Sequence, residues 1–225
     1  MTERPSPAAD IINIRNADDF AEAFDVSRET LDRLKIYADC LHEWQPAINL
    51  VSPTTLDQLW QRHIADSAQL LAYATDSHAF ADLGSGAGFP GMVIAILIAG
   101  NTDKSVQLIE SNGKKCAFLR HVARQTGTPV EIIDARIETL SDKPTLTPVD
   151  CITARALAPL GKLLEYAAPL FAENTKALFL KGRDTKREID EAKTQWSFRS
   201  ELHQSRTDPD GQIVEIRDLQ AVKLS

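Results

Sequence analysis

The chain has 225 residues, of which 43% are hydrophobic and 25% are charged. This composition is typical of globular proteins and excludes disordered, collagen-like and coiled-coil chains. The formal net charge of −7 argues, taken alone, against a nucleic-acid partner, because phosphate contacts need lysine and arginine. The length favours one α/β domain with an appended segment. We predict a helical cap over residues 1–76 and the main domain over residues 77–225.

The first third of the chain predicts two amphipathic helices. Ser27 can cap a helix whose apolar residues recur every three or four positions and which ends before Pro46. Ser52 as the N-cap and Pro53 at the first helical position start a second helix, whose apolar face continues to Leu71. Both helices need a partner surface for their apolar faces.

From residue 79 onward, short β-rich runs alternate with helical segments. This alternation predicts right-handed crossovers and a parallel sheet that is covered on both faces. The last two extended runs flank a strong turn signal at residues 207–211, which predicts a terminal antiparallel hairpin. We expect strands at Ala79–Leu83, Ser105–Ile109, Val130–Ile133, Val149–Thr153, Ala177–Leu180, Phe198–Gln204 and Gln212–Leu219, and helices at Gly91–Ala99, Asn112–Gln125 and Pro159–Phe171.

A glycine-rich loop follows the first strand and opens the next helix. In open α/β sheets this junction is where nucleotide-like ligands bind. Gly86, Gly88 and Gly91 match the dinucleotide fingerprint, and Asp82 with Gly84, Gly86 and Gly88 equally matches the D-x-G-x-G-x-G loop of S-adenosylmethionine enzymes. The spacing does not choose between these ligands.

The chemistry of the loop favours S-adenosylmethionine. The carboxylate of Asp82 and the missing N–H of Pro90 both weaken a pyrophosphate site. The cationic ammonium and sulfonium of S-adenosylmethionine are instead attracted to Asp82, directly or through water. Glu110 ends the second strand and can accept both ribose hydroxyls, a role that both ligand classes share.

Several classes of site and location are disfavoured. The three cysteines, Cys40, Cys116 and Cys151, are widely spaced and lack a C-x-x-C pair, which argues against a disulfide framework or a structural zinc site, and we predict no metal. The longest apolar run is too short to cross a bilayer, and no signal or transit peptide is visible. We therefore expect a cytoplasmic protein.

The acidic excess is confined to the N-terminal part of the chain. Residues 1–76 carry 6 basic and 13 acidic side chains, whereas residues 77–225 carry 19 of each. Two stretches are locally positive, and on charge alone solvated helix faces are the favoured explanation. They contain Lys114, Lys115, Arg120 and Arg124, and then Lys176, Lys181, Arg183, Lys186 and Arg187.

Taken in order, these motifs resemble the RsmG family, also called glucose-inhibited division protein B, whose members are methyltransferases of small-subunit ribosomal RNA. The resemblance runs from about Trp44 to Lys181. Its most specific parts are the segment Arg62-His63-Ile64-x-Asp66-Ser67 and the Gly-Phe-Pro-Gly ending of the glycine loop. Leu108-Ile109-Glu110-Ser111, Lys114-Lys115, Arg136-x-Glu138, Arg155-Ala156 and Lys181-Gly182 complete it.

The resemblance implies a class I S-adenosylmethionine-dependent methyltransferase, Rossmann-like, with a seven-stranded sheet, a C-terminal antiparallel hairpin and an N-terminal helical cap. It implies that S-adenosylmethionine is the cofactor and that the enzyme methylates guanine N7 in 16S ribosomal RNA or the small ribosomal subunit, at a guanosine of the decoding region. The implied cofactor residues, with Asp82 and Gly86 from the loop chemistry, are Asp82, Gly84, Gly86, Phe89, Glu110, Ile137, Glu138 and Arg155. The candidate RNA contacts are Lys114, Lys115, Lys181 and Arg183.

The sequence assigns no general base. Guanine N7 has an in-plane lone pair and no proton, so its methylation needs positioning rather than proton removal. His63 is expected to be a core histidine on an apolar helix face rather than a base. Two alternatives stay open at this point, namely an NAD(P)-dependent oxidoreductase and a non-catalytic RNA- or protein-binding module that kept a nucleotide pocket.

Overall fold

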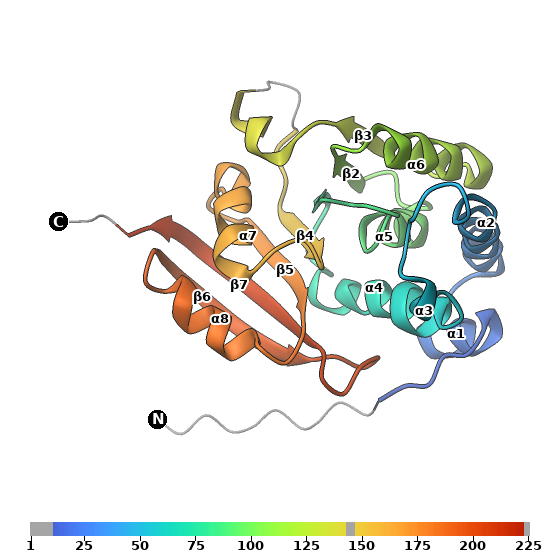
Figure 1. Cartoon of the computed structure of the whole chain (residues 1–225), viewed down its shortest axis with the longest axis horizontal. Helices are drawn as coiled ribbons and strands as arrows, with labels where there is room; N and C mark the ends of the chain where they lie inside the picture. The colour runs from blue at the N-terminus through green and yellow to red at the C-terminus, as the bar shows by residue number, and fades with distance from the viewer. Residues whose placement is uncertain (1–10, 143–146, 223–225) are drawn as a thin grey trace.

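The computed structural model describes residues 11–142 and 147–222. Seven strands form one mixed sheet in the order β3-β2-β1-β4-β5-β7-β6 (Figure 1). The first five are parallel and the last two join antiparallel. Their bounds are β1 (Ala79–Leu83), β2 (Ser105–Glu110), β3 (Glu131–Asp134), β4 (Cys151–Arg155), β5 (Lys176–Lys181), β6 (Trp196–Gln204) and β7 (Gln212–Ala221). All seven predicted strands, the parallel arrangement of the first five and the terminal hairpin are confirmed.

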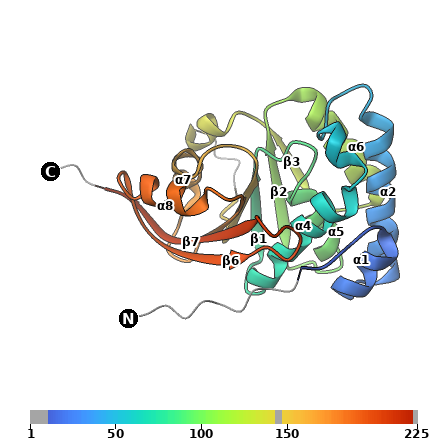
Figure 2. The ribbon, with the colours of Figure 1, turned by 60° about the horizontal axis from the view of Figure 1, so that its bottom comes forward.

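Helices cover both faces of the sheet, as Figure 2 shows. One face carries α2 (Arg28–Trp44), α4 (Asp66–Ala68), α5 (Gly91–Ile98) and α6 (Gly113–Thr126), and the other carries α7 (Leu160–Ala167) and α8 (Thr185–Ala192). The central strands are buried on both sides because alternate residues enter two separate cores. Phe80 and Leu108 join the α2–α5–α6 core, whereas Ala81 and Ile109 join the α7–α8 core.

The N-terminal helices share the first of these cores. Leu34, Tyr37 and Leu41 of α2 are fully buried against Met92 and Phe118 of the sheet-flanking helices. Tyr37 also donates a hydrogen bond of 2.5 Å to the carbonyl of Ala87 in the glycine loop. The segment predicted as a cap therefore forms a packed layer that touches the loop following β1.

The helix starts follow the capping residues only in part. Ser27 caps α2 by accepting the N–H of Thr30, as predicted. A further helix, α1 (Ala17–Phe24), is capped by Asn16 and was not predicted from the sequence. Ser52 stands at the N-cap of α3 (Pro53–Leu56), but its hydroxyl lies 2.8 Å from the hydroxyl of Thr54 and makes no cap bond.

The single long helix predicted from Pro53 to Leu71 is wrong. The chain instead forms α3, a π-helical turn η1 (Trp60–Ala65), α4 and a 3-10 turn η2 (Gln69–Tyr73). Apolar spacing of three to four residues is compatible with all of these turns, so periodicity did not reveal the breaks. π-helical turns are frequent at functional sites, and this one carries Arg62 and His63. In the described part of the chain, none of the helices combines the length and apolarity that crossing a membrane would require.

Candidate functional site

The carboxyl ends of β1 to β4 surround a cavity of about 370 Å³, which we call the strand-end cavity. The loop after β1 contributes Gly84 and Gly86, and the residues after β2 contribute Glu110 and Ser111. This edge is where open α/β sheets bind ligands. Its other lining residues are Ile109, Lys115, Ala135, Arg136, Ile137, Glu138, Arg155, Ala156, Leu157 and Tyr166.

Glu110 is built into the floor of this cavity. Only 8% of its surface is exposed, and its two oxygens accept the N–H of Gly86 at 2.8 Å and the N–H of Asn112 at 2.7 Å. The bond from Gly86 requires a backbone φ of +57°, which glycine adopts without strain. Each carboxylate oxygen retains a second acceptor site, so Glu110 can still receive the two hydroxyls of a ribose.

The opposite wall holds Ile137, Glu138 and Tyr166. The Tyr166 hydroxyl donates to the Glu138 carboxylate at 3.1 Å, and Leu157 packs against Gly84. Apolar side chains beside a fixed carboxylate suit the face and the amino group of a purine. Tyr166 was not predicted, because it comes from α7 and reaches the cavity only through the crossover after β4.

Asp82 and Phe89 line neither this cavity nor the one described next. Asp82 is 1% exposed, and its carboxylate accepts the Thr153 hydroxyl at 2.8 Å and the Gly91 N–H at 3.2 Å. Burial raises the pKa of Asp82 to about 6, and these hydrogen bonds oppose the rise. The structure gives Asp82 a local role, which is to fix the start of α5 beneath the glycine loop.

Phe89 is 4% exposed and packs against three side chains. Its ring centroid lies 5.3 Å from that of Tyr37 and 4.9 Å from that of His63, and the Arg155 guanidinium lies 5.0 Å from it. The Arg155 guanidinium therefore lies over the Phe89 ring, and this cation–π contact helps to hold the guanidinium in place. Both residues lie behind the lining of the two cavities, and the cofactor roles expected for them stay predictions.

A second cavity of about 500 Å³ lies between the N-terminal helical segment and the β6–β7 hairpin, and we call it the hairpin cavity. Arg155 and Ala156 line both cavities, so they form a shared wall. Its remaining lining residues are Ser52, Thr55, Arg62, His63, Asp66, Leu180, Lys181, Gly182, Arg183, Asp184, Glu188, Ser205, Thr207, Asp208, Gly211 and Gln212.

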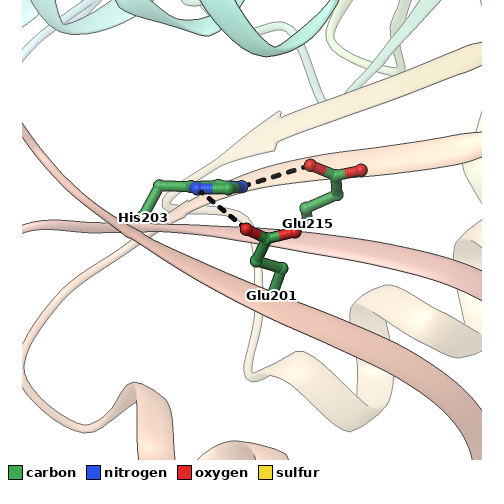
Figure 3. Close-up of side chains that lie close together, drawn as sticks. All are labelled: Glu201, His203 and Glu215. Atoms are coloured by element: carbon green, nitrogen blue, oxygen red, sulfur yellow. Dashed lines mark hydrogen bonds and ion pairs between the residues drawn. The ribbon is translucent and has the colours of Figure 1, made fainter. Parts of the chain in front are cut away.

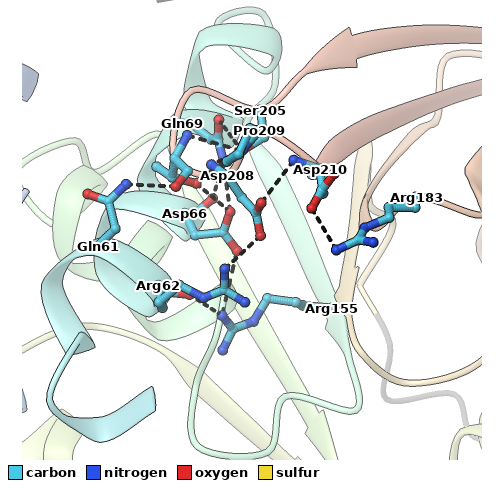
Figure 4. A network of polar contacts seen from close by, with 12 residues as sticks. Gln61, Arg62, Asp66, Gln69, Arg155, Arg183, Ser205, Asp208, Pro209 and Asp210 are labelled. Carbon is cyan, nitrogen blue, oxygen red and sulfur yellow. Dashed lines mark hydrogen bonds and ion pairs between the residues drawn. The ribbon is translucent and has the colours of Figure 1, made fainter. Parts of the chain in front are cut away.

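A polar network joins the walls of the hairpin cavity (Figure 4). Asp66 accepts the Thr207 hydroxyl at 2.8 Å and lies 3.6 Å from Arg155, while Arg62 pairs with Asp208 at 2.7 Å. Burial raises the pKa of Asp66, and the nearby Arg155 charge opposes this rise. Sequence reasoning gave Arg62 and Asp66 no role, because their partners lie 89 or more positions away.

The four candidate RNA contacts occupy different settings. Lys114 is exposed at the start of α6, whereas Lys115 lines the strand-end cavity. Lys181 lines the hairpin cavity, and its ammonium pairs with Glu188 at 2.6 Å and donates to the Ala158 carbonyl at 3.1 Å, with 11% of the side chain exposed. That arrangement ties β5 to α8, and the RNA contact expected of Lys181 stays a prediction. Arg183 is 79% exposed at the cavity rim and pairs with Asp210.

A separate cluster of Glu201, His203 and Glu215 lies on the hairpin (Figure 3). The two carboxylates approach different ring nitrogens, at 3.9 Å from Nδ1 and 3.1 Å from Nε2. Glu215 also accepts the Nε–H of Arg217 at 2.6 Å. These side chains therefore form a cross-strand polar network around an imidazole.

Comparison with known proteins identifies close relatives. The family model described as rRNA small subunit methyltransferase G matches residues 30–213. The chain is 47% identical over 220 residues to the ribosomal RNA small subunit methyltransferase G of Rhodopseudomonas palustris strain BisB5, covering 96% of this chain and 93% of that one. It is 51% identical over 191 residues to the protein of the same name from Bradyrhizobium diazoefficiens, covering 85% and 73%.

Solved structures share the fold at low identity. A SAM dependent methyltransferase from Aquifex aeolicus is 14% identical with a TM-score of 0.54, covering 75% of this chain and 94% of that one. A ribosomal protein L11 methylase from Lactobacillus delbrueckii subsp. bulgaricus is 15% identical with a TM-score of 0.53, covering 68% and 76%. The chain thus shares its overall fold with methyltransferases of known structure.

Proposed function

The chain belongs to the rRNA small subunit methyltransferase G family, and from this premise we propose that it methylates N7 of a decoding-region guanosine in 16S ribosomal RNA, with S-adenosylmethionine as the donor. The observation that carries the proposal is the shared wall of Arg155 and Ala156 between the two cavities. A methyl group passes directly between two bound molecules, so their sites must adjoin.

The strand-end cavity fits the donor. In this proposal Glu110 accepts the two ribose hydroxyls, and Ile137 and Glu138 hold the adenine, which is supported by their positions in the cavity lining. When bound, S-adenosylmethionine supplies a methyl group on a cationic sulfur, which departs as a neutral thioether while the guanine N7 lone pair forms the new bond and the purine takes the positive charge. No proton leaves N7, which agrees with a site whose buried histidine is neutral.

The hairpin cavity fits the acceptor base. Arg62 and Asp66 enter it from the N-terminal segment, and Thr207 and Asp208 enter it from the hairpin. The carboxylates of Asp66 and Asp208 can stabilise the positive charge that the purine gains during transfer. Holding the two reacting molecules in line at short distance can supply about 7–11 kcal/mol of the barrier reduction.

The RNA around the base needs phosphate contacts, and Lys114 and Arg183 are the exposed candidates from the sequence. The base must also leave its stack or lie in an open loop to enter the cavity. A ribosomal RNA substrate supports our proposal that the enzyme acts in the cytoplasm.

The test is methyl transfer from labelled S-adenosylmethionine to small subunits that lack the modification. Label on one guanosine, recovered as N7-methylguanosine, is expected. Thermal denaturation gives an independent check, because S-adenosylmethionine or its demethylated product should stabilise the protein and NAD or NADP should not. Stabilisation by NAD, or donor binding without any labelled RNA, would favour the oxidoreductase or the binding module.

A further inference from the structure

Arg155 is fixed at the shared wall by Arg62, His63 and Phe89, and Figure 4 shows it beside Arg62 and Asp66. Its Nη1 donates to the Arg62 carbonyl at 2.8 Å, and its Nη2 donates to Nδ1 of His63 at 2.7 Å. Phe89 lies under the guanidinium plane. These two hydrogen bonds use two of the five N–H groups of the side chain, so Arg155 can still donate to molecules in either cavity.

The hydrogen bonds of His63 define its tautomer. A guanidinium only donates, so Nδ1 must accept, and the ring proton lies on Nε2, which then donates to the Thr55 hydroxyl at 2.9 Å. The ring is 7% exposed. Burial, followed by the charges of Arg155 and Arg62, lowers the pKa of His63 to about 3.

We propose that His63 is a positioning residue for methyl transfer, which acts by accepting a hydrogen bond from Arg155 and so fixing that guanidinium on the wall between donor and acceptor. The inference rests on the proposed function. Arg62 accepts a hydrogen bond from Arg155 with its backbone carbonyl, so a substitution of the Arg62 side chain would leave that hydrogen bond in place. His63 is the neutral side-chain acceptor that Arg155 contacts, and it comes from the π-helical turn of the N-terminal segment.

The charge of His63 matters to this role. A protonated imidazole would turn Nδ1 into a donor that faces a donor, and Arg155 would lose the contact. Asp66, at 3.6 Å from Arg155, supplies the balancing negative charge, and Tyr37 and Asp82 are the other titratable groups that act on this guanidinium. The neutral His63 ring therefore orients the Arg155 guanidinium, while the Asp66 carboxylate balances its positive charge.

Two isosteric substitutions separate the contacts of His63. His63→Asn keeps a carbonyl oxygen near the position of Nδ1, whereas His63→Gln places its amide near the position of Nε2 and faces Thr55. His63→Leu removes both. His78→Asn, at an exposed histidine before β1 and at the opposite end of the strand, is the control.

The assay is methylation of unmethylated small subunits, with kcat and the KM of each substrate, alongside donor affinity by calorimetry and Tm. We expect His63→Leu and His63→Gln to lower kcat by about 10- to 100-fold, the size expected for a reacting group misplaced by about 1 Å. His63→Asn should stay within about threefold of wild type.

Equal losses in the asparagine and glutamine variants, or full activity of the leucine variant, would overturn the inference. If the leucine variant does not fold, the asparagine and glutamine pair decides. If the wild-type protein leaves the RNA unlabelled, the proposed function is contradicted instead. Failure of the inference about His63 and failure of the proposed function are therefore distinguishable.

Discussion

The Nη2 atom of Arg155 lies 2.7 Å from Nδ1 of His63, so an imidazole from the N-terminal segment meets a guanidinium at the end of β4. This contact joins two parts of the chain that are 92 positions apart. The contact requires Nδ1 of His63 to accept a hydrogen bond, so protonation of this imidazole would disrupt the site.

We predict that the rate of methyl transfer shows no histidine titration between about pH 5.5 and about pH 8.5. The pKa of His63 is lowered to about 3, so the ring stays neutral throughout this range. The measurement is kcat against pH with saturating donor and small subunits. A step near the ordinary histidine pKa that disappears in His63→Asn would show that His63 titrates and would contradict the assignment.

Glu110→Gln should weaken donor binding by about 10- to 100-fold. The substitution removes the charge that receives the ribose hydroxyls, and hydrogen bonds to charged groups are worth about 1.5–3 kcal/mol. Calorimetric titration with S-adenosylmethionine measures the change. Glu131→Gln, at the exposed start of β3, is the matched control and should bind normally. Unchanged affinity in Glu110→Gln would remove this residue from the donor site.

Asp82 should make stability depend on pH. Its folded-state pKa of about 6 lies above its ordinary 3.8, so its contribution is full below 3.8 and is lost as pH rises through about 6. At 1.36 kcal/mol per unit, the complete loss is about 3 kcal/mol. Wild type should therefore lose about 2 kcal/mol relative to Asp82→Asn between about pH 4 and about pH 8, as measured by urea unfolding. Parallel pH curves for the two proteins would refute the raised pKa.

Gly91→Ala should destabilise the fold by about 1–3 kcal/mol. A Cβ at this position would overlap the Leu108 side chain and lie 2.6 Å from the Cβ of Asp82. Gly161→Ala is the control, because no atom lies within 4 Å of its added Cβ in α7. Thermal and denaturant unfolding compare the two variants. Equal stability of both would mean that α5 and β2 can separate without cost.

Lys114→Gln should weaken binding of small-subunit RNA and reduce the slope of log affinity against log salt by about 1. Lys186→Gln, on α8 at the other face of the sheet, should change neither. Filter binding over a salt series distinguishes them. Lys115 is unsuitable for this test, because it lines the strand-end cavity and its removal would alter donor binding as well.

Much of the fold was predictable because its signals are local. Strands such as Ala79–Leu83 and Ser105–Glu110 are short apolar runs between turn residues, and the glycines around Gly86 mark the ligand edge. Glu110 was found because it ends a strand beside that loop. These positions need no knowledge of distant partners.

The rest depends on tertiary contacts. The setting of Lys181 depends on α8, which brings Glu188 against it, and the setting of Asp82 depends on Thr153 and Gly91, which donate hydrogen bonds to its carboxylate. Tyr166 enters the cavity only because α7 packs where it does. Arg62 and Asp66 of the hairpin cavity were given no role, since this cavity joins the N-terminal segment to the C-terminal hairpin, which no local pattern connects.

The most direct measurement is mass-spectrometric identification of the nucleoside that carries the label after incubation of unmethylated small subunits with this protein and labelled S-adenosylmethionine. Adjoining donor and acceptor cavities without a general base predict N7-methylguanosine at a single position. Label on an exocyclic amine, a ribose or a pyrimidine carbon, or no label from a protein that binds the donor, would contradict the account.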